Sequence, residues 1–239
     1  MLPKIVIGVG VLVVLFFLMG TLFRPGFWQD LRPKGNTPLS NVGAPPCPDP
    51  LVLKTPVDLD QATSVLYPGQ MRGGNFKPHG GFRFDNARNN AVEVRAPMEA
   101  YVTDATRYIE MGEVQYMFDF QSDCGIRFRF DHLLTLAPKF AQIAERLPEP
   151  KENDSRTTHI NKNVKVTEGE IIATAVGFQK TNNVSVDFGV YDMRGKLLSS
   201  PQDNAVCWFD LLPASDSAKV KSLPAGDSKS GSQSTLCKP

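Results

Sequence analysis

Apolar and polar side chains alternate over many short stretches between residues 80 and 191, as expected for β-strands with one buried face. In the run 126–130, for example, Arg127 and Arg129 stand between apolar residues, and a solvated face is expected for both arginines. Strands are predicted near residues 81–84, 91–95, 100–106, 113–119, 125–130, 164–166, 171–175 and 184–191. The pattern predicts a mainly β domain over residues 51–212, long enough for one ordinary hydrophobic core.

One stretch follows a different period. Apolar residues recur at helical spacing over residues 136–147 (LAPKFAQIAERL), which predicts a short helix. The polar, irregular residues that follow complete an insertion over residues 136–163, and its second half is expected on the surface. Residues 58–66 fit either a helix or a strand before the turn Tyr67-Pro68-Gly69.

The N-terminal segment predicts a membrane anchor. Residues 5–23 (IVIGVGVLVVLFFLMGTLF) carry no charge, and their number is close to the roughly 20 apolar residues that cross a bilayer. A single transmembrane helix after the short flank 1–4 is therefore expected. A cleaved signal peptide is the alternative, but the apolar core is long and no small-residue cleavage site follows it. Residues 24–50 are rich in Pro, Gly and Asn, as is typical of a tether.

Two features disagree about the side of the membrane on which the domain lies. Basic residues after the anchor outnumber the one lysine before it, which favours the cytoplasm. The four cysteines are Cys47, Cys124, Cys207 and Cys237. Their even number without metal-site spacing favours disulfides and an oxidising, extracytoplasmic compartment, although four free thiols in a reducing compartment are the alternative.

The expected disulfide pairs are Cys207–Cys237 and Cys47–Cys124. The first pair is favoured because it would hold the tail 213–239. That tail is rich in Ser, Lys, Asp and Gly, a composition that predicts disorder because it buries too little apolar area.

The overall charge narrows the possible partners. The 239 residues carry 26 basic and 25 acidic side chains, for a net charge of +1. Nucleic-acid binding usually needs a strongly basic face, so no nucleic-acid partner is expected. The sequence also indicates no Ser-His-Asp or Cys-His catalytic set.

The candidate functional stretch is residues 77–102. Side chains two apart in a strand share a face, so His79, Arg83 and Asp85 are expected to line a groove. The two phenylalanines between these polar residues are expected to face the core. A simpler interpretation of His79, which precedes two glycines, is a turn residue with a satisfied ring.

Five short motifs occur in a recognisable order along the chain. They are His79–Phe84, Val94–Pro97, Phe130–Leu133, Val166–Ile172 and Val184–Val190. Together they resemble the lysostaphin-type (LytM-like) zinc endopeptidases, which cut peptide cross-links in bacterial cell walls. The resemblance covers about residues 67–192. It implies an antiparallel β-sheet domain of the lysostaphin type, resembling a β-sandwich or half-barrel, with one inserted short helix and a single transmembrane helix before it.

The family's metal ligands are mostly missing. In the family a first His, an Asp four residues later and the second His of the last motif hold zinc. The matching residues here are His79, Arg83 and Asp187. Because arginine cannot coordinate a metal and catalytic zinc normally has three protein ligands, the resemblance implies a degenerate member without zinc. The family's two assisting histidines match His132 and Ser185, and no catalytic residue is expected.

The expected binding groove consists of His79, Arg83, Asp85, His132 and Asp187. An ion pair between Arg83 and Asp187 across neighbouring strands is expected to fill the place of the metal, because the Arg fork fits a carboxylate. In the alternative, Asp85 replaces the lost carboxylate, and zinc is held by His79, Asp85 and Asp187.

These expectations lead to three hypotheses on function. The first is an inactive peptidase-like domain, anchored in the cell membrane and extracytoplasmic, that binds cell-wall peptide or glycan, or a wall hydrolase as scaffold or regulator. The second is an active zinc endopeptidase with an altered ligand set, and the third is a structural component of an envelope assembly. The long segment between Leu133 and Val164 favours protein binding, and it would argue against peptide binding if it packed across the groove.

Overall fold

The computed structural model describes residues 45–161, 164–196, 199–226 and 234–237. The predicted flank 1–4, the anchor 5–23 and residues 24–44 of the tether lie outside these ranges. In the described ranges, no helix has both the length and the apolar character needed to cross a membrane.

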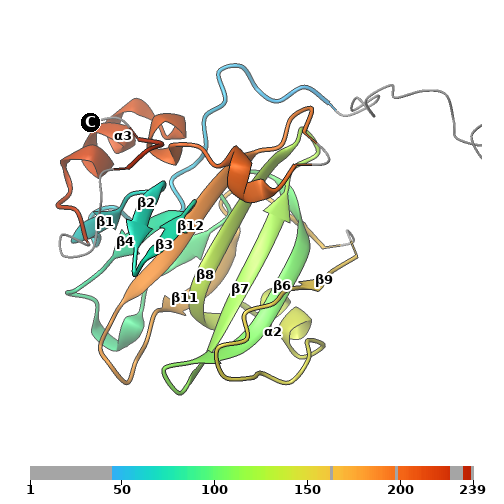
Figure 1. Ribbon diagram of the computed structural model, residues 1–239, viewed down its shortest axis with the longest axis vertical. Helices are drawn as coiled ribbons and strands as arrows, with labels where there is room; N and C mark the ends of the chain where they lie inside the picture. Colours follow the sequence, from blue (N-terminus) through green and yellow to red (C-terminus); the bar gives the residue numbers. More distant parts are fainter. Residues whose placement is uncertain (1–44, 162–163, 197–198, 227–233, 238–239) are drawn as a thin grey trace, which may run out of the picture. The chain divides into compact units, whose positions relative to one another are not determined.

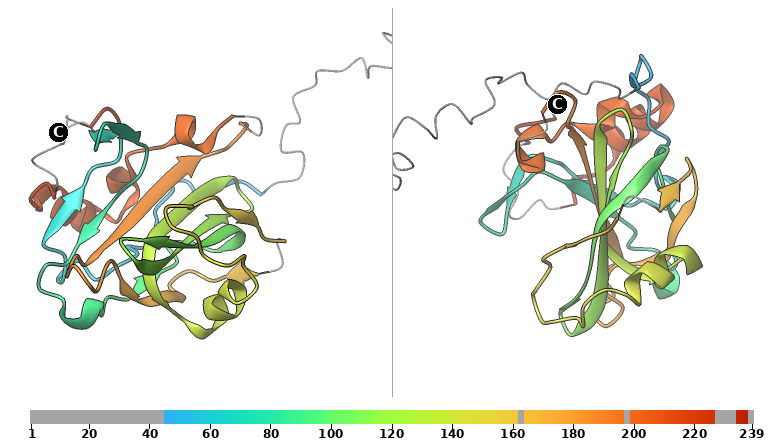
Figure 2. Two further views of the ribbon diagram at one scale, coloured as in Figure 1. Left: turned by 60° about the horizontal axis from the view of Figure 1, so that its bottom comes forward. Right: turned by 90° about the vertical axis from the view of Figure 1, so that its right-hand side faces the viewer.

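Ten strands of the described chain form one antiparallel sheet (Figure 1). Its main path, in spatial order, is β1 (Ser64–Leu66), β4 (Gly80–Arg83), β12 (Ser185–Asp192), β8 (Ile126–Leu136), β7 (Glu113–Gln121), β6 (Ala100–Glu110) and β10 (Lys165–Val166). Beside this path, β11 (Ile171–Val176) pairs with β5 (Val94–Arg95) and β8, and β9 (Thr158–His159) pairs with β6. The predicted mainly β architecture is confirmed. Figure 2 shows the long strands β6 to β8 in green beside β12 in orange.

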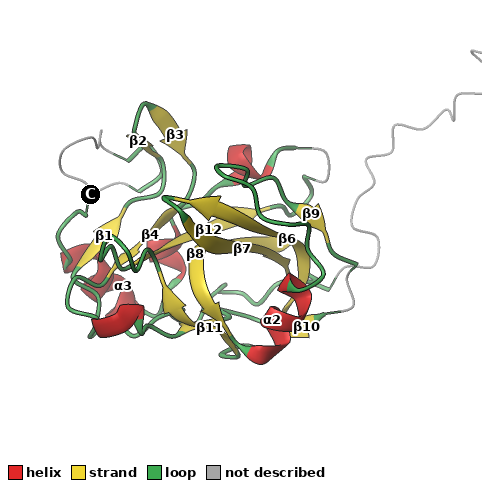
Figure 3. Cartoon of the chain, turned by 90° about the horizontal axis from the view of Figure 1, so that it is seen from below, coloured by secondary structure: helices red, strands yellow, loops and turns green. Residues whose placement is uncertain are grey.

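A separate hairpin consists of β2 (Gln70–Arg72) and β3 (Asn75–Lys77). Its turn is Gly73-Gly74, where both residues have positive φ (56° and 78°), a conformation that glycine adopts without steric cost. Figure 3 shows this hairpin standing apart from the main sheet.

Two α-helices occur in the described part of the chain. Helix α2 (Pro138–Ala144) lies within the stretch predicted as helical, begins with Pro in its first turn and buries Phe140 completely. Helix α3 (Ala214–Ser222) was not predicted. Short 3₁₀ helices span Arg88–Asn90 (η1), Pro201–Asn204 (η2) and Trp208–Leu211 (η3).

The prediction of a disordered tail is wrong for the residues of the tail that are described. Val220 of α3 is fully buried, and Val65 of β1 exchanges backbone hydrogen bonds with residues 224 and 226 (2.9 and 2.8 Å). Cys237 is buried in a disulfide with Cys207. The tail has too little apolar area to order itself, but the edge of β1 and the disulfide supply the partners that its composition lacks.

Both disulfides, Cys47–Cys124 and Cys207–Cys237, are formed with the pairing favoured by the sequence analysis. The first joins the end of the predicted tether to the turn between β7 and β8. The second closes a loop of 30 residues around α3.

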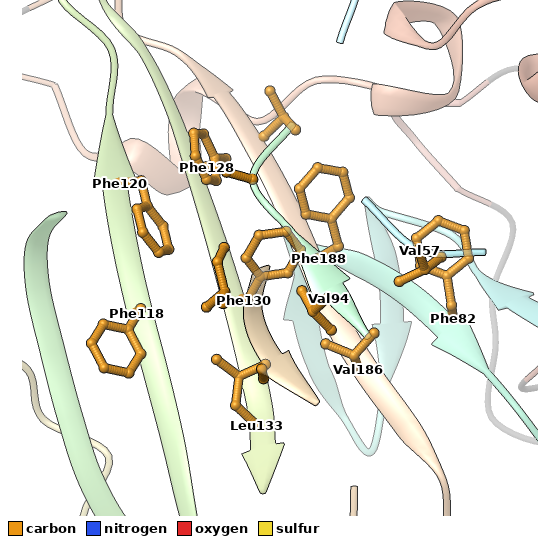
Figure 4. Close-up of a cluster of buried hydrophobic side chains, with 14 of the residues drawn as sticks. Val57, Phe82, Val94, Phe118, Phe120, Phe128, Phe130, Leu133, Val186 and Phe188 are labelled. Atoms are coloured by element: carbon orange, nitrogen blue, oxygen red, sulfur yellow. The ribbon is translucent and has the colours of Figure 1, made fainter. Parts of the chain in front are cut away.

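Aromatic side chains fill the core on one face of the sheet (Figure 4). The rings of Phe120 and Phe128 stack with centroids 4.7 Å apart, and those of Phe130 and Phe188 stack at 4.9 Å. These four side chains are fully buried, and burial of each contributes about 1.5–3 kcal/mol. Since strand side chains alternate, the neighbouring polar residues of β7, β8 and β12 are directed to the opposite face.

Candidate functional site

That opposite face carries a groove with a volume of about 630 Å³. We call it the polar groove. It is lined by Lys77, His79, Tyr108, Glu110, Met117, Arg129, Asp131, His132, Ser155, Arg156, Thr157 and Asp187. Strands β6, β7, β8 and β12 supply its floor, and β3 and residues 155–157 of the insertion supply its sides. Of the predicted groove residues, His79, His132 and Asp187 are therefore brought together.

A glycine allows His79 to reach Asp187. Asp187 of β12 stands opposite Gly81 of β4 in the register of the two strands. A Cβ atom on Gly81 would lie 2.4 Å from the carbonyl oxygen of Val186 and 3.1 Å from Oδ1 of Asp187, so only glycine fits there. The imidazole Nε2 of His79, two residues earlier in the chain, lies 3.0 Å from Oδ2 of Asp187.

A β-bulge aims two further side chains into the groove. Asp131 and His132 of β8 together stand opposite one residue of β7, Met117. His132 has φ +60°, which is uncommon for a residue other than glycine. Its amide donates to Oδ1 of Asp131 (2.8 Å), and its carbonyl accepts from the amide of Gly177 (2.7 Å), so the strained backbone is held on both sides.

Two histidines and a tyrosine contact the carboxylates of the floor. Asp131 and Asp187 are direct cross-strand partners, an arrangement of like charges that is destabilising by itself. Nε2 of His132 lies 3.8 Å from Oδ2 of Asp187, and its Nδ1 lies 3.8 Å from Glu110. The hydroxyl of Tyr108 donates to Oδ1 of Asp131 at 2.7 Å. His79, His132 and Tyr108 thus offset the repulsion between the two aspartates.

The surroundings shift the pKa values of this cluster. Burial alone would raise the pKa of Asp187, but His79 first, and then His132 and Arg72, hold that pKa well below its usual range. Burial alone would lower the pKa of His132, but the nearby carboxylates, Asp131 foremost, outweigh burial and raise that pKa. The floor is therefore ionic, with a carboxylate at Asp187 and an imidazolium favoured at His132.

Tyr108 is a fixed hydrogen-bond donor in this cluster. Burial and the adjacent carboxylate of Asp131 raise the pKa of Tyr108 far above its usual value. The phenol therefore keeps its proton at physiological pH and is unsuited to act as a base.

The predicted ion pair between Arg83 and Asp187 is wrong. Arg83 stands opposite Ser185 in the register, whereas Asp187 lies two residues further along β12. Arg83 instead pairs at 3.1 Å with Asp85, which is on its own segment and therefore close at hand. Among the ion pairs of the described ranges, Asp187 has only histidine partners.

Asp85 and Ser185 lie outside the polar groove. The side chain of Asp85 is 55 % exposed and accepts a hydrogen bond from the hydroxyl of Thr63 at 2.9 Å. The alternative ligand set of His79, Asp85 and Asp187 is therefore not assembled. Ser185 is buried at the start of β12 and does not line the groove.

The residues at the family's metal positions do not fit zinc. One position carries the permanent charge of Arg83, and the Nε2 atom of His79 already contacts Asp187. Across the described residues, no group of three or more His, Cys, Asp or Glu side chains is arranged to hold a metal ion.

The expectation that Arg127 and Arg129 form a solvated face is wrong. Arg129 donates two hydrogen bonds to Asp119 (2.9 and 2.6 Å), whose side chain is only 1 % exposed, and Arg127 lies 3.2 Å from the same carboxylate. Burial would lower the pKa of Arg129, but the hydrogen bonds and charge of Asp119 raise it above its usual value. The sequence feature that could have predicted this network is Asp119, a single acidic residue between two phenylalanines. Its opposite charge makes it a suitable partner for the arginines of the next strand.

Two smaller cavities continue the polar groove. One of about 260 Å³ shares Lys77, His79 and Arg129 with it and is also lined by Phe76 and Tyr191. The other, of about 380 Å³, includes residues 148–158 of the insertion. The insertion thus borders the groove through residues 155–157.

Few known proteins resemble this chain in sequence or structure. No protein-family model matches the sequence, and no curated protein matches it. A crystal structure of Csd3 from Helicobacter pylori is similar with a TM-score of 0.36 and 18% sequence identity, over 60% of this chain and 32% of that chain. The chain therefore spans about a third of that protein, and we base neither fold nor function on a similarity this low.

Proposed function

We propose that this chain is a membrane-anchored protein whose β domain lies on the extracytoplasmic side and binds cell-wall peptide or glycan without cutting it. In this proposal the domain is a degenerate lysostaphin-type (LytM-like) peptidase domain that acts as a scaffold or regulator. The apolar stretch 5–23 and the two disulfides support the location.

One observation carries the proposal. Three positions that match functional positions of the zinc endopeptidases, His79, His132 and Asp187, converge on the floor of one groove. Two of them match metal-ligand positions and contact each other directly at 3.0 Å. This contact supports a groove that has kept its shape and polarity but does not use a metal.

A protein partner, such as a wall hydrolase, is the second candidate. The observation that favours it is the insertion, which borders the groove through residues 155–157. The side chain of Arg156 in this segment is 86 % exposed, so a partner could contact it without displacing any other element.

The test is co-sedimentation of the full chain, in mild non-ionic detergent, with purified bacterial peptidoglycan. We expect the protein to sediment with the wall and to release no soluble peptides. The variant His132→Asn should sediment less, because Asn tolerates positive φ but removes the charge from the floor. Asp85→Asn, outside the groove, is the control and should sediment like the natural chain.

Two results would contradict the proposal. If the natural chain stays in the supernatant, the wall is not its ligand and the protein partner becomes the candidate. If soluble peptides are released and a chelator stops their release, the domain is an active metal enzyme.

A further inference from the structure

The cations of the polar groove are not equally available to a ligand. Arg129 is held by two hydrogen bonds to buried Asp119. Arg156 makes two hydrogen bonds to Asp154 (2.7 and 2.6 Å). Lys77 is different: its side chain has no hydrogen bond or ion pair within the described residues, although the residue is partly buried.

The carboxylates of the groove also differ in how closely they are paired. Asp187 contacts His79 at 3.0 Å, and Asp131 accepts hydrogen bonds from the Tyr108 hydroxyl and the His132 amide. Glu110 has no group this close, since its nearest ion-pair partner is Nδ1 of His132 at 3.8 Å. Its side chain is 39 % exposed and can accept further hydrogen bonds.

One ammonium group that is unpaired within the described residues, on Lys77, and one partly exposed carboxylate, on Glu110, whose ion-pair partner is His132 at 3.8 Å, therefore line the same groove. Both groups act electrostatically on the ring of His132: Glu110 raises its pKa and Lys77 lowers it. Lys77 also lines the adjoining cavity of about 260 Å³, so a ligand can approach it from either cavity. The volume of about 630 Å³ lies within the range of roughly 300–1,000 Å³ typical of small-ligand sites.

We propose that the polar groove binds a short peptide with both a free carboxylate and a free ammonium group, the carboxylate on Lys77 and the ammonium on Glu110. The inference rests on the proposed function, since it names the class of wall ligand. Charge-assisted hydrogen bonds at both ends would fix the direction of the peptide. A ligand without these charges would desolvate Lys77 and Glu110 without giving either a partner, which costs affinity.

The test uses soluble peptide fragments released from purified bacterial peptidoglycan, in three forms. One form is untreated, one has its amino groups acetylated, and one has its carboxyl groups converted to amides. Binding to the full chain in non-ionic detergent is measured by titration calorimetry. The same titrations are made with Lys77→Gln and Glu110→Gln. The matched controls are Lys165→Gln and Glu99→Gln, which remove a lysine and a glutamate that pair with each other at 2.8 Å outside the groove.

We expect untreated fragments to bind the natural chain about ten-fold or more tightly than either blocked form, the range for one charged hydrogen bond. Lys77→Gln should bind untreated and amidated fragments equally weakly, and Glu110→Gln should bind untreated and acetylated fragments equally weakly. The two control variants should bind within about two-fold of the natural chain. Urea unfolding of every variant shows whether it is folded.

The possible failures can be told apart. If untreated fragments bind but blocking either group, or removing Lys77, has no effect, the inference is wrong while the proposed function stands. If untreated fragments do not bind at all, the inference fails; the proposed function fails with it only if the chain also stays in the supernatant when mixed with intact peptidoglycan.

Discussion

The contact between His79 and Asp187 gives a prediction about stability and its pH dependence. The change is Asp187→Asn, which keeps the size of the side chain and its ability to accept a hydrogen bond but removes the charge. The three side chains involved, with His132, are only 15–18 % exposed, so solvent screens their interaction weakly. A charged hydrogen bond in such a place contributes about 1.5–3 kcal/mol, and we expect a loss of about 2 kcal/mol in the free energy of unfolding near pH 6.

The loss should depend on pH in a defined way. The pKa of Asp187 is lowered in the folded state, so its contribution is present above its unfolded pKa of about 3.9 and is lost as the pH falls through the folded value. The pKa of His132 is raised, so its contribution is full below about 6.5 and is lost as the pH rises through the folded value. The difference between the natural chain and Asp187→Asn should therefore be largest between about pH 4 and 6.5.

Other ionisable groups face this cluster and act in both proteins. They are Arg72, Lys77, Tyr108, Glu110 and Asp131. Because both proteins contain these groups, the difference between the two unfolding free energies cancels most of their effect.

The assay is urea unfolding followed by tryptophan fluorescence, since Trp208 is fully buried in the core. Asp85→Asn is the matched control. Its carboxylate is 55 % exposed in an ion pair with Arg83, and such pairs contribute at most about 1 kcal/mol. The reasoning is refuted if Asp187→Asn costs no more than Asp85→Asn, or if its cost is the same from pH 3 to pH 9.

Three further predictions concern the frame of the groove. Asp119→Asn should lower the free energy of unfolding by about 3–5 kcal/mol, measured in urea, because it leaves Arg129 without its carboxylate partner, whereas Arg127 keeps Asp104 at 3.1 Å. An effect below about 1 kcal/mol would contradict the buried network. Replacing Cys207 and Cys237 by Ser should lower the free energy of unfolding by about 3–4 kcal/mol, because the disulfide closes a loop of 30 residues. The same change should expose α3 to limited proteolysis. Unchanged protease resistance would show that the tail needs no disulfide. Gly81→Ala should lower the free energy of unfolding by about 1–3 kcal/mol and weaken co-sedimentation with peptidoglycan, because the added methyl group collides with β12 and displaces Asp187. A variant that is fully stable and still binds would refute the close approach of the two strands.

Most of the longer strands were predictable because apolar and polar residues alternate over much of their length. The stretch predicted at 184–191 is strand β12 at Ser185–Asp192, and the helix predicted within 136–147 is α2 at Pro138–Ala144. The hairpin β2–β3 was missed, although Gly73-Gly74 between two short extended runs is a common signal for a two-residue turn.

The site was only partly predictable, because register and bulges decide which polar side chains meet. The buried positions of β8 are 126, 128 and 130 and then 133, and this break in the alternation marks the bulge that turns Asp131 and His132 into the groove. The partner of Asp187 was predicted wrongly because a shared strand face does not fix which residue stands opposite. The ordered tail was missed because composition describes a segment alone, whereas this tail is held by β1 and a disulfide.

The most direct test of the central claim is the zinc content of the purified full chain, compared with the double variant Arg83→Asp, Asp187→His. The double variant restores the ligand types of the zinc endopeptidases beside His79. We predict that the natural chain binds no zinc and that the double variant binds close to one equivalent. Near-stoichiometric zinc in the natural chain would contradict the account of a groove without a metal.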